Sequence, residues 1–224
     1  MRSFFSALSE YENSVCSFSG SPSGDPLFYD ILFFGEPEWL YWNLLIRYFY
    51  PEDTPLRRLL IAHSEQVRDK ALAILERSGI VLDARLVADG AMLHDIGICR
   101  CHAPSILCVG TEPYIAHGVI GAAMLRDYAR DHALDLAPYE RICERHTGSG
   151  LTAADIQKQG LPLPVRDYLP ETPEERLVCL ADKFFSKSGD RKEKSLDRIR
   201  CSMEKFGPDS LARFEDMCRC FRVE

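Results

Sequence analysis

The chain has 224 residues, of which 46% are hydrophobic and 27% are charged, the balance of a soluble globular protein long enough to bury a core. Its 27 basic residues against 34 acidic ones give a formal net charge of −7, which excludes a broad basic surface for nucleic acid but allows a local basic pocket. No uncharged apolar run reaches the ~18 residues of a membrane helix, and nine cysteines, an odd number, argue for reduced thiols in the cytoplasm rather than a disulfide framework.

Residues 1–52 form a predicted N-terminal extension that is richer in aromatic residues than the rest of the chain. Its start, with one arginine and an apolar patch broken by Glu10, makes a poor secretory signal. Serine, glycine and proline between Ser17 and Pro26 predict a loop or linker, so the extension is expected to be partly disordered. Glu36–Tyr50 predicts an amphipathic helix that docks on the main body and ends before Pro51.

From Thr54 onward apolar residues recur with helical spacing, and strand-like alternation is scarce. Several expected helices begin at a capping residue, such as Asp83 or the Thr172-Pro173 pair. About eight helices are expected here: Leu59–Ser78, Asp83 to near Gly97, Pro113–Ala133, Pro138 to Gly148, one from Thr152, Thr172 to near Gly189, Ser195–Phe206 and Ser210–Phe221. The expected fold class is all-α, with a main domain over 53–188 and C-terminal helices over 189–224 packed on it.

Histidine and aspartate recur on the inward faces of the expected helices. His63, for example, shares a face with Val67 and Ala71, one and two turns further along its helix. Five helices each direct such a residue towards one interior, and together these residues are His63, His94, Asp95, His117, His146 and Asp182.

Buried carboxylates and imidazoles need a charge partner or a metal. No lysine or arginine is expected on the same helix faces, so a divalent cation is the preferred partner. Imidazole and carboxylate together suit Fe, Mn, Co, Ni or Zn, with Mg possible where oxygen ligands dominate. Taken singly, each histidine fits a hydrogen-bonded core residue, and Asp182 fits a surface or capping residue. The shared inward placement on successive helices favours the metal site.

The order of these residues resembles the HD superfamily of metal-dependent phosphohydrolases. His94-Asp95-Ile96-Gly97 matches the HDIG signature letter for letter, and the resemblance covers about Leu59 to Ser188. His117 with the glycine-rich helix after it, and His146 to Gly150, resemble the branch that includes symmetrical diadenosine tetraphosphate hydrolases. The stretch from Gly160 to Asp182 is more similar to uncharacterised HDIG proteins, many of them archaeal.

The resemblance implies a helical bundle that holds two divalent metals per chain. It implies that one metal is held by His63, His94, Asp95 and Asp182. It implies that a second is held by His117 and His146, with Asp95 bridging the two. Metals arranged in this way activate water as hydroxide near neutral pH and absorb charge that develops on phosphorus.

Further site residues are predicted beside these ligands, each with a structural alternative. Arg100 is expected to clamp a phosphate or else to lie solvated at a helix end. Lys183 is expected to be a pocket cation or a surface residue, and Arg145 is similarly open. Thr147 begins a loop whose backbone amides can bind an anion or simply end a helix. Asp95, His117, Arg100 and Lys183 are the candidate catalytic residues.

The stretch Cys99-Arg100-Cys101-His102, with Cys108 beyond it, invites comparison with a zinc site. Its spacing matches no standard four-ligand pattern, and no second CxxC pair accompanies it. Packing or loop lining is therefore the preferred interpretation of these cysteines.

The predicted function is cleavage of a phosphomonoester or phosphoanhydride, most plausibly of a nucleotide, by metal-bound hydroxide. Two alternatives stay open: a mixed-valent di-iron oxygenase of the same fold, and a non-catalytic module that binds a nucleotide. The expected partner is a small phosphorylated substrate, and no membrane association is expected. The expected location is the cytoplasm. The sequence leaves the substrate, the metal, the oligomeric state and the general acid open.

Overall fold

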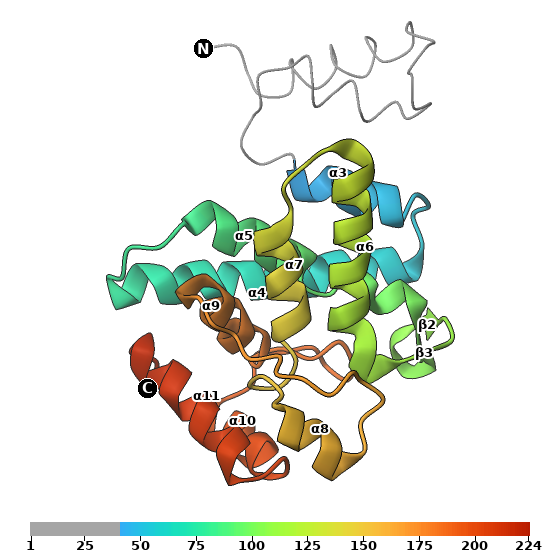
Figure 1. Ribbon diagram of the computed structural model, residues 1–224. Helices are drawn as coiled ribbons and strands as arrows, with labels where there is room; N and C mark the ends of the chain where they lie inside the picture. The colour runs from blue at the N-terminus through green and yellow to red at the C-terminus, as the bar shows by residue number, and fades with distance from the viewer. Residues whose placement is uncertain (1–40) are drawn as a thin grey trace, which may run out of the picture. The chain divides into compact units, whose positions relative to one another are not determined.

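The computed structural model describes residues 41–224, which lie in one compact unit over 38–224 (Figure 1). The disorder predicted for the start of the extension lies outside the described residues. Nine α-helices occur in the described part: α3 (Tyr41–Phe49), α4 (Pro55–Ser78), α5 (Ala84–Leu93), α6 (His117–His132), α7 (Ala137–Arg145), α8 (Ala153–Gln159), α9 (Pro173–Asp182), α10 (Leu196–Glu204) and α11 (Pro208–Cys220). The all-α fold class is thereby confirmed.

Capping chemistry sets most helix boundaries. The Thr54 side chain accepts the Arg57 amide at the start of α4, and Gly79 ends that helix in the left-handed conformation. Asp83 and Thr172 cap α5 and α9 in the same way, as their positions predict. Helix α4 begins four residues before the expected start at Leu59, because Thr54 caps it and Pro55 suits the first helical position.

A small sheet lies between α5 and α6, in a chain where strand-like alternation is scarce. Strands β1 (Cys101–Ala103), β2 (Cys108–Val109) and β3 (Glu112–Pro113) lie in the order β2-β1-β3, with β1 antiparallel to β2 and parallel to β3. Strands this short carry no detectable alternation in sequence. A 3-10 turn over Ile96–Arg100 precedes the sheet, so helix α5 ends before His94 rather than near Gly97.

Three hydrophobic clusters form the core of the described part of the chain, and α4 contributes to the two largest. Leu60 belongs to the cluster that includes Met92 and Leu125, whereas Val67 belongs to the cluster of α9 and α11. His63 lies between Leu60 and Val67 on the buried face of α4. The site described below is therefore placed where the two clusters meet along this helix.

Gly97 lets the turn after α5 touch the start of α6. A Cβ built on Gly97 would lie 2.2 Å from the His117 carbonyl oxygen and 2.5 Å from the Gly121 amide nitrogen. Both atoms are backbone and cannot rotate away. The glycine of the HDIG segment therefore holds His94 and His117 close together.

Within residues 41–224, no helix combines the length and apolar composition that a membrane crossing requires.

Candidate metal centre

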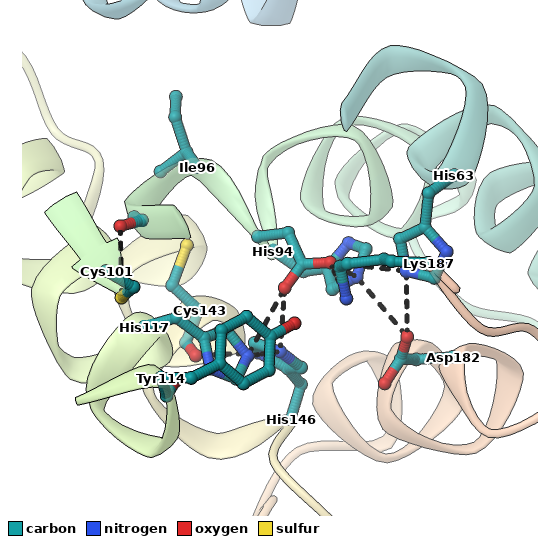
Figure 2. A network of polar contacts seen from close by, with 12 residues as sticks. His63, His94, Ile96, Cys101, Tyr114, His117, Cys143, His146, Asp182 and Lys187 are labelled. Carbon is teal, nitrogen blue, oxygen red and sulfur yellow. Dashed lines mark hydrogen bonds and ion pairs between the residues drawn. The ribbon is translucent and has the colours of Figure 1, made fainter. Parts of the chain in front are cut away.

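The six predicted ligands converge on one buried cluster, although they come from separate elements (Figure 2). His63 lies within α4, whereas the others lie at the ends of helices. His94 and Asp95 follow α5, His117 is the first residue of α6, His146 follows α7, and Asp182 is the last residue of α9. Helix ends from different parts of the chain thus meet around Asp95.

One half of the cluster gathers around the Oδ2 atom of Asp95. His63 Nε2 lies 3.2 Å and His94 Nε2 lies 3.0 Å from this oxygen. The same two nitrogens lie 3.1 Å and 3.5 Å from Asp182 Oδ1. These four residues supply donor atoms within 4.8 Å of one another, a spacing that can hold one metal ion.

The other half gathers around the Oδ1 atom of the same carboxylate. His117 Nε2 lies 3.3 Å and His146 Nε2 lies 3.5 Å from Asp95 Oδ1, and the two imidazole nitrogens are 3.0 Å apart. Asp95 therefore presents one oxygen to each half. Asp95 thus belongs to both groups of candidate metal ligands among the described residues.

Backbone hydrogen bonds fix the orientation of three of the rings. The Nδ1 atoms of His94, His117 and His146 lie 2.6, 2.7 and 2.7 Å from the carbonyl oxygens of Ala91, Tyr114 and Cys143. A carbonyl only accepts, so each Nδ1 carries a proton and Nε2 is the atom that faces the cluster, with a lone pair whenever the ring is neutral. This is the orientation that a histidine needs in order to bind a metal through Nε2.

Burial controls the charge of the second half. Burial outweighs the pull of Asp95 and lowers the pKa of His117 to about 3, and it also lowers the pKa of His146. Both rings are therefore neutral near pH 7, and their Nε2 lone pairs face each other at 3.0 Å without a proton between them. A cation resolves this repulsion.

The carboxylates carry the opposite shift. Burial acts to raise the pKa of Asp95, but the charges of His94 and Lys187 and the neighbouring imidazoles of His146 and His63 outweigh it and hold that pKa well below its usual range. Burial also acts to raise the pKa of Asp182, but the charge of Lys183 is the main effect that outweighs it and lowers this pKa well below its usual range. Burial similarly acts to lower the pKa of His94, yet Asp95 and Asp182 raise it to about 9.

Unsatisfied polar atoms show that these residues fit a metal. Asp95 is fully buried, yet neither of its oxygens makes a hydrogen bond of acceptable geometry within the described residues, and the same is true of His94 Nε2. The imidazole nitrogens of His63, His94 and His117 lie within ion-pair distance of the Asp95 oxygens, and Lys187 Nζ contacts Oδ2. Buried polar atoms left in this state are costly unless an ion satisfies them.

Two lysines reach the cluster, so the expectation that no cation neutralises it was wrong. Lys187 Nζ contacts Asp95 Oδ2, and Lys183 Nζ lies 2.8 Å from Asp182 Oδ2 and donates to the His146 carbonyl at 3.1 Å. Both side chains are about nine-tenths buried. The error came from extending α9 to Gly189, because the helix ends at Asp182 and the chain then turns back over the site.

Lys187 was not singled out from the sequence, and neither was Tyr114. The Tyr114 ring stacks on His117, with ring centroids 4.7 Å apart and an interplanar angle of 17°. The serines and glycine around Lys187 are the one sequence signal that this segment is a loop rather than a helix. Loop residues carry no periodicity from which a direction can be inferred.

The other residues predicted to bind substrate differ in whether they contact the cluster. Arg100 is exposed at the end of the 3-10 turn, and its side chain makes no hydrogen bond or ion pair with the described residues. Arg145 binds the Leu169 carbonyl at 2.8 Å and Glu171 at 2.7 Å, contacts that fasten a loop. Thr147 directly follows His146 and is half-buried. Of the four candidates, only Lys183 contacts the cluster within the described part of the chain.

The cysteines near the sheet stay outside the metal-ligand groups formed by residues 41–224. Cys101 and Cys108 are buried, and their thiols point at the backbone carbonyls of Gly97 and Ile106. Burial raises the pKa of Cys101 to about 12 and that of Cys108 to about 11, so both stay protonated. This geometry agrees with packing as the preferred interpretation.

Comparison with known proteins identifies relatives that match a little over half of the chain. A tRNA (cytidine(56)-2'-O)-methyltransferase of Picrophilus torridus is 40% identical over 128 residues, which are 57% of this chain and 32% of that protein. An uncharacterised protein of Methanocaldococcus jannaschii is 41% identical over 125 residues, 56% of this chain and 63% of the relative. A tRNA (cytidine(56)-2'-O)-methyltransferase of Thermoplasma volcanium is 35% identical over 135 residues, 60% of this chain and 33% of the relative.

The chain thus spans about a third of the length of the two methyltransferases and less than two thirds of the third relative. No solved structure matches it at a significant level.

A helical fold with histidines and aspartates converging on one buried carboxylate defines a protein with a candidate metal centre. The HD domain model matches residues 60–186, more than half of the chain. The chain belongs to the HD domain family, which places it in the metal-dependent phosphohydrolase superfamily.

Proposed function

We propose that the chain is a hydrolase that cleaves a phosphomonoester or phosphoanhydride, with two divalent cations held by the cluster. The observation that carries this proposal is the division of Asp95, whose Oδ2 faces His63 and His94 and whose Oδ1 faces His117 and His146. Two positions that share one carboxylate suit displacement at phosphorus, because one reacting oxygen can be held at each position.

A divalent cation, when bound, lowers the pKa of a water ligand and stabilises negative charge on phosphoryl oxygens. His63, His94, Asp95 and Asp182 would hold one such ion, and Asp95, His117 and His146 would hold another. The Nδ1 hydrogen bonds of three rings keep these ligands in place without further reorganisation.

We infer that two lysines of this chain bind the phosphoryl group. Lys187 and Lys183 contact the carboxylates of the cluster, and their ammonium groups would replace part of the hydration shell of a bound phosphate. The Tyr114 ring stacks on the His117 ring. We infer that Lys187 is the principal phosphate contact, because it alone reaches the bridging carboxylate from a loop.

A nucleotide is the proposed substrate type. The resemblance of the His117 and His146 segments to dinucleotide hydrolases supports it. More than half of the chain is also 35–40% identical to parts of two proteins named as tRNA methyltransferases, and the activity for which those two proteins are named acts on nucleotides. Dinucleoside polyphosphates, nucleoside monophosphates and nucleoside triphosphates therefore belong in the first substrate screen.

The test is elemental analysis of the purified full chain, together with phosphate release under added Mn, Co, Ni, Mg and Zn. About two metals per chain, with release from a nucleotide or aryl phosphate, is the expected result. Asp95→Ala should lose both metals, whereas His102→Ala, an exposed histidine outside the cluster, should keep them.

Three results would refute the proposal. Tightly bound iron with oxygen-dependent chemistry and no phosphate release would identify the oxygenase alternative. Nucleotide binding by the metal-loaded chain without turnover would identify a binding module. One metal in the wild type, unchanged in His117→Ala and His146→Ala, would exclude the two-metal arrangement.

A further inference from the structure

A second concave site lies between α4 and the C-terminal helices, apart from the metal centre. Its cavity has a volume of 560 Å³, within the ~300–1,000 Å³ of small-molecule sites. The walls come from α4, the segment that follows α9, the start of α10 and the residues after α11. Figure 1 shows α10 and α11, in orange and red, on the side of the unit that carries α9.

Basic side chains dominate the polar lining of this cavity. The basic residues are Lys70, Arg77, Lys194, Arg200 and Arg222, and the acidic ones are Glu193, Asp197 and Glu224. This excess of positive charge occurs in a chain whose formal net charge is −7. Random placement would favour the opposite sign, so the local excess is a feature of the cavity.

Two of the five cations are already neutralised. Lys70 pairs with Glu193 and lies over the Phe184 ring. Arg200 pairs with Glu215 at 2.7 Å and with Asp197 at 3.3 Å. These pairs also occupy two of the three acidic groups of the lining, which leaves Glu224 as the remaining acid.

The other three cations have no ion-pair partner among residues 41–224. Arg77 donates its Nε to the Ala73 carbonyl of its own helix at 3.1 Å, which leaves its terminal nitrogens without a carboxylate. Lys194 and Arg222 make only backbone contacts. Lys194 is half-buried, and its burial lowers the pKa of the ammonium group, the cost of a charge that lacks a counter-ion. Three positive charges without an ion-pair partner among residues 41–224 therefore line one cavity, with the side chains of Arg77 and Arg222 exposed to solvent and Lys194 half-buried.

We propose that this cavity is a binding site for a phosphate-bearing anion, held by Lys194, Arg77 and Arg222. Arginine and lysine together suit phosphate, because the guanidinium contacts two oxygens at once and the ammonium supplies a point charge. A multivalent anion also matches three cations better than a single carboxylate does. Free pyrophosphate and the phosphate chain of a nucleotide share this chemistry, so both are possible sources of the ligand.

The proposed anion site is separate from the metal centre but shares one segment with it. The Lys194 amide donates to the Phe184 carbonyl at 2.8 Å and closes a loop over residues 184–194. Phe184 and Lys194, at the two ends of this loop, line the cavity, and Lys187 in the middle of the loop contacts Asp95. The proposal does not require that the metal centre is catalytic, because it concerns binding at a different set of side chains.

The experiment is calorimetric titration of the full chain with pyrophosphate, ADP and adenosine, with and without EDTA. EDTA removes metal-dependent phosphate binding at Asp95, and the part of the remaining heat that is lost in the cavity variants reports the second site. The variants are Lys194→Met and Arg77→Met, alone and combined. Lys192→Met is the matched control, because Lys192 is exposed in the same segment and does not line the cavity.

The expected result is metal-independent binding of pyrophosphate that weakens about tenfold or more in each cavity variant and is unchanged in Lys192→Met. Equal affinity for pyrophosphate and ADP would identify the anion itself as the ligand, whereas tighter ADP binding would identify a nucleotide. Adenosine should not bind. Thermal melting of each variant separates lost binding from lost folding, and removal of a repelling charge should not lower the melting temperature.

The proposal is overturned by wild-type protein that binds pyrophosphate and ADP only in the absence of EDTA. It is also overturned if Lys192→Met weakens binding as much as Lys194→Met. Binding of tRNA, with no binding of either small anion, would assign the cations to a macromolecular surface instead.

Discussion

Replacement of Gly97 by alanine tests how the HDIG segment builds the site. The added methyl would lie 2.2 Å from the His117 carbonyl oxygen, 2.5 Å from the Gly121 amide nitrogen and 3.0 Å from the Gly121 Cα. All three atoms are backbone, so relief requires that α6 moves away from the turn. Overpacking of a dense core costs about 1–3 kcal/mol, and two rigid backbone contacts place this variant at the upper end, at about 3 kcal/mol.

For a unit of this size, that loss corresponds to a fall in melting temperature of roughly 6–12 °C. The same movement displaces His117 from Asp95, so the variant should also lose about one metal per chain. Thermal melting and elemental analysis measure the two effects on the same sample. Gly79→Ala is the control, because its left-handed φ of 68° costs about 1–2 kcal/mol without any atom within 4 Å.

The steric account fails if Gly97→Ala melts no lower than Gly79→Ala. Full metal content in a destabilised Gly97→Ala would also contradict it, since it would show that the contact between the turn and α6 does not position His117.

Three further predictions follow from individual side chains. His117→Ala should lose about one of two metals and most activity while its circular dichroism stays native, whereas His102→Ala should match the wild type by elemental analysis. Lys187→Met should raise the KM for a phosphorylated substrate about tenfold or more without loss of metal, which initial-rate kinetics would measure; an unchanged KM would remove Lys187 from the phosphate site. Burial raises the pKa of Asp89 above its ordinary 3.8, in spite of the opposing charge of Arg85. A carboxyl group whose pKa is raised by folding stabilises the protein fully at pH values below its unfolded pKa, and this stability is lost as the pH rises through its folded pKa. Asp89→Asn should therefore be more stable than the wild type at pH 7. In urea titrations, its free energy of unfolding should change less with pH above pH 4.

The helices could be predicted because their signals are local. A cap such as Thr54 acts within four residues of the helix it starts, and the stripe that places His63 between Leu60 and Val67 repeats every turn. The same stripe correctly indicated that the predicted ligands share one interior. Local hydrogen bonds and helical spacing therefore carried both the fold class and the candidate ligand set.

What could not be predicted depends on contacts between distant segments. Strands of two or three residues such as β2 exist only because β1 lies beside them. Lys187 reaches Asp95 because α9 ends at Asp182 and the loop turns back, and no periodicity in a loop reports such a direction. The position directly after the motif pointed at Arg100, which is exposed, whereas the cation that contacts Asp95 is Lys187, which follows Arg100 by 87 residues.

The position of most candidate ligands at helix ends explains how their side chains are oriented towards the cluster. In mid-helix each carbonyl is already bonded to an amide four residues later, so a side chain there has no free acceptor to orient it. At the C-terminal end of a helix the carbonyls are free, and His94 and His146 each use the one three residues earlier. His117 instead begins α6, and its ring uses the Tyr114 carbonyl, which also accepts the His117 backbone amide. His63 lies within α4 and lacks this support, because its Nδ1 has no hydrogen-bond partner among the described residues. Its orientation therefore depends on packing and on Asp182, 3.1 Å from its Nε2, which makes the final aspartate of the pattern an orienting residue as well as a candidate ligand.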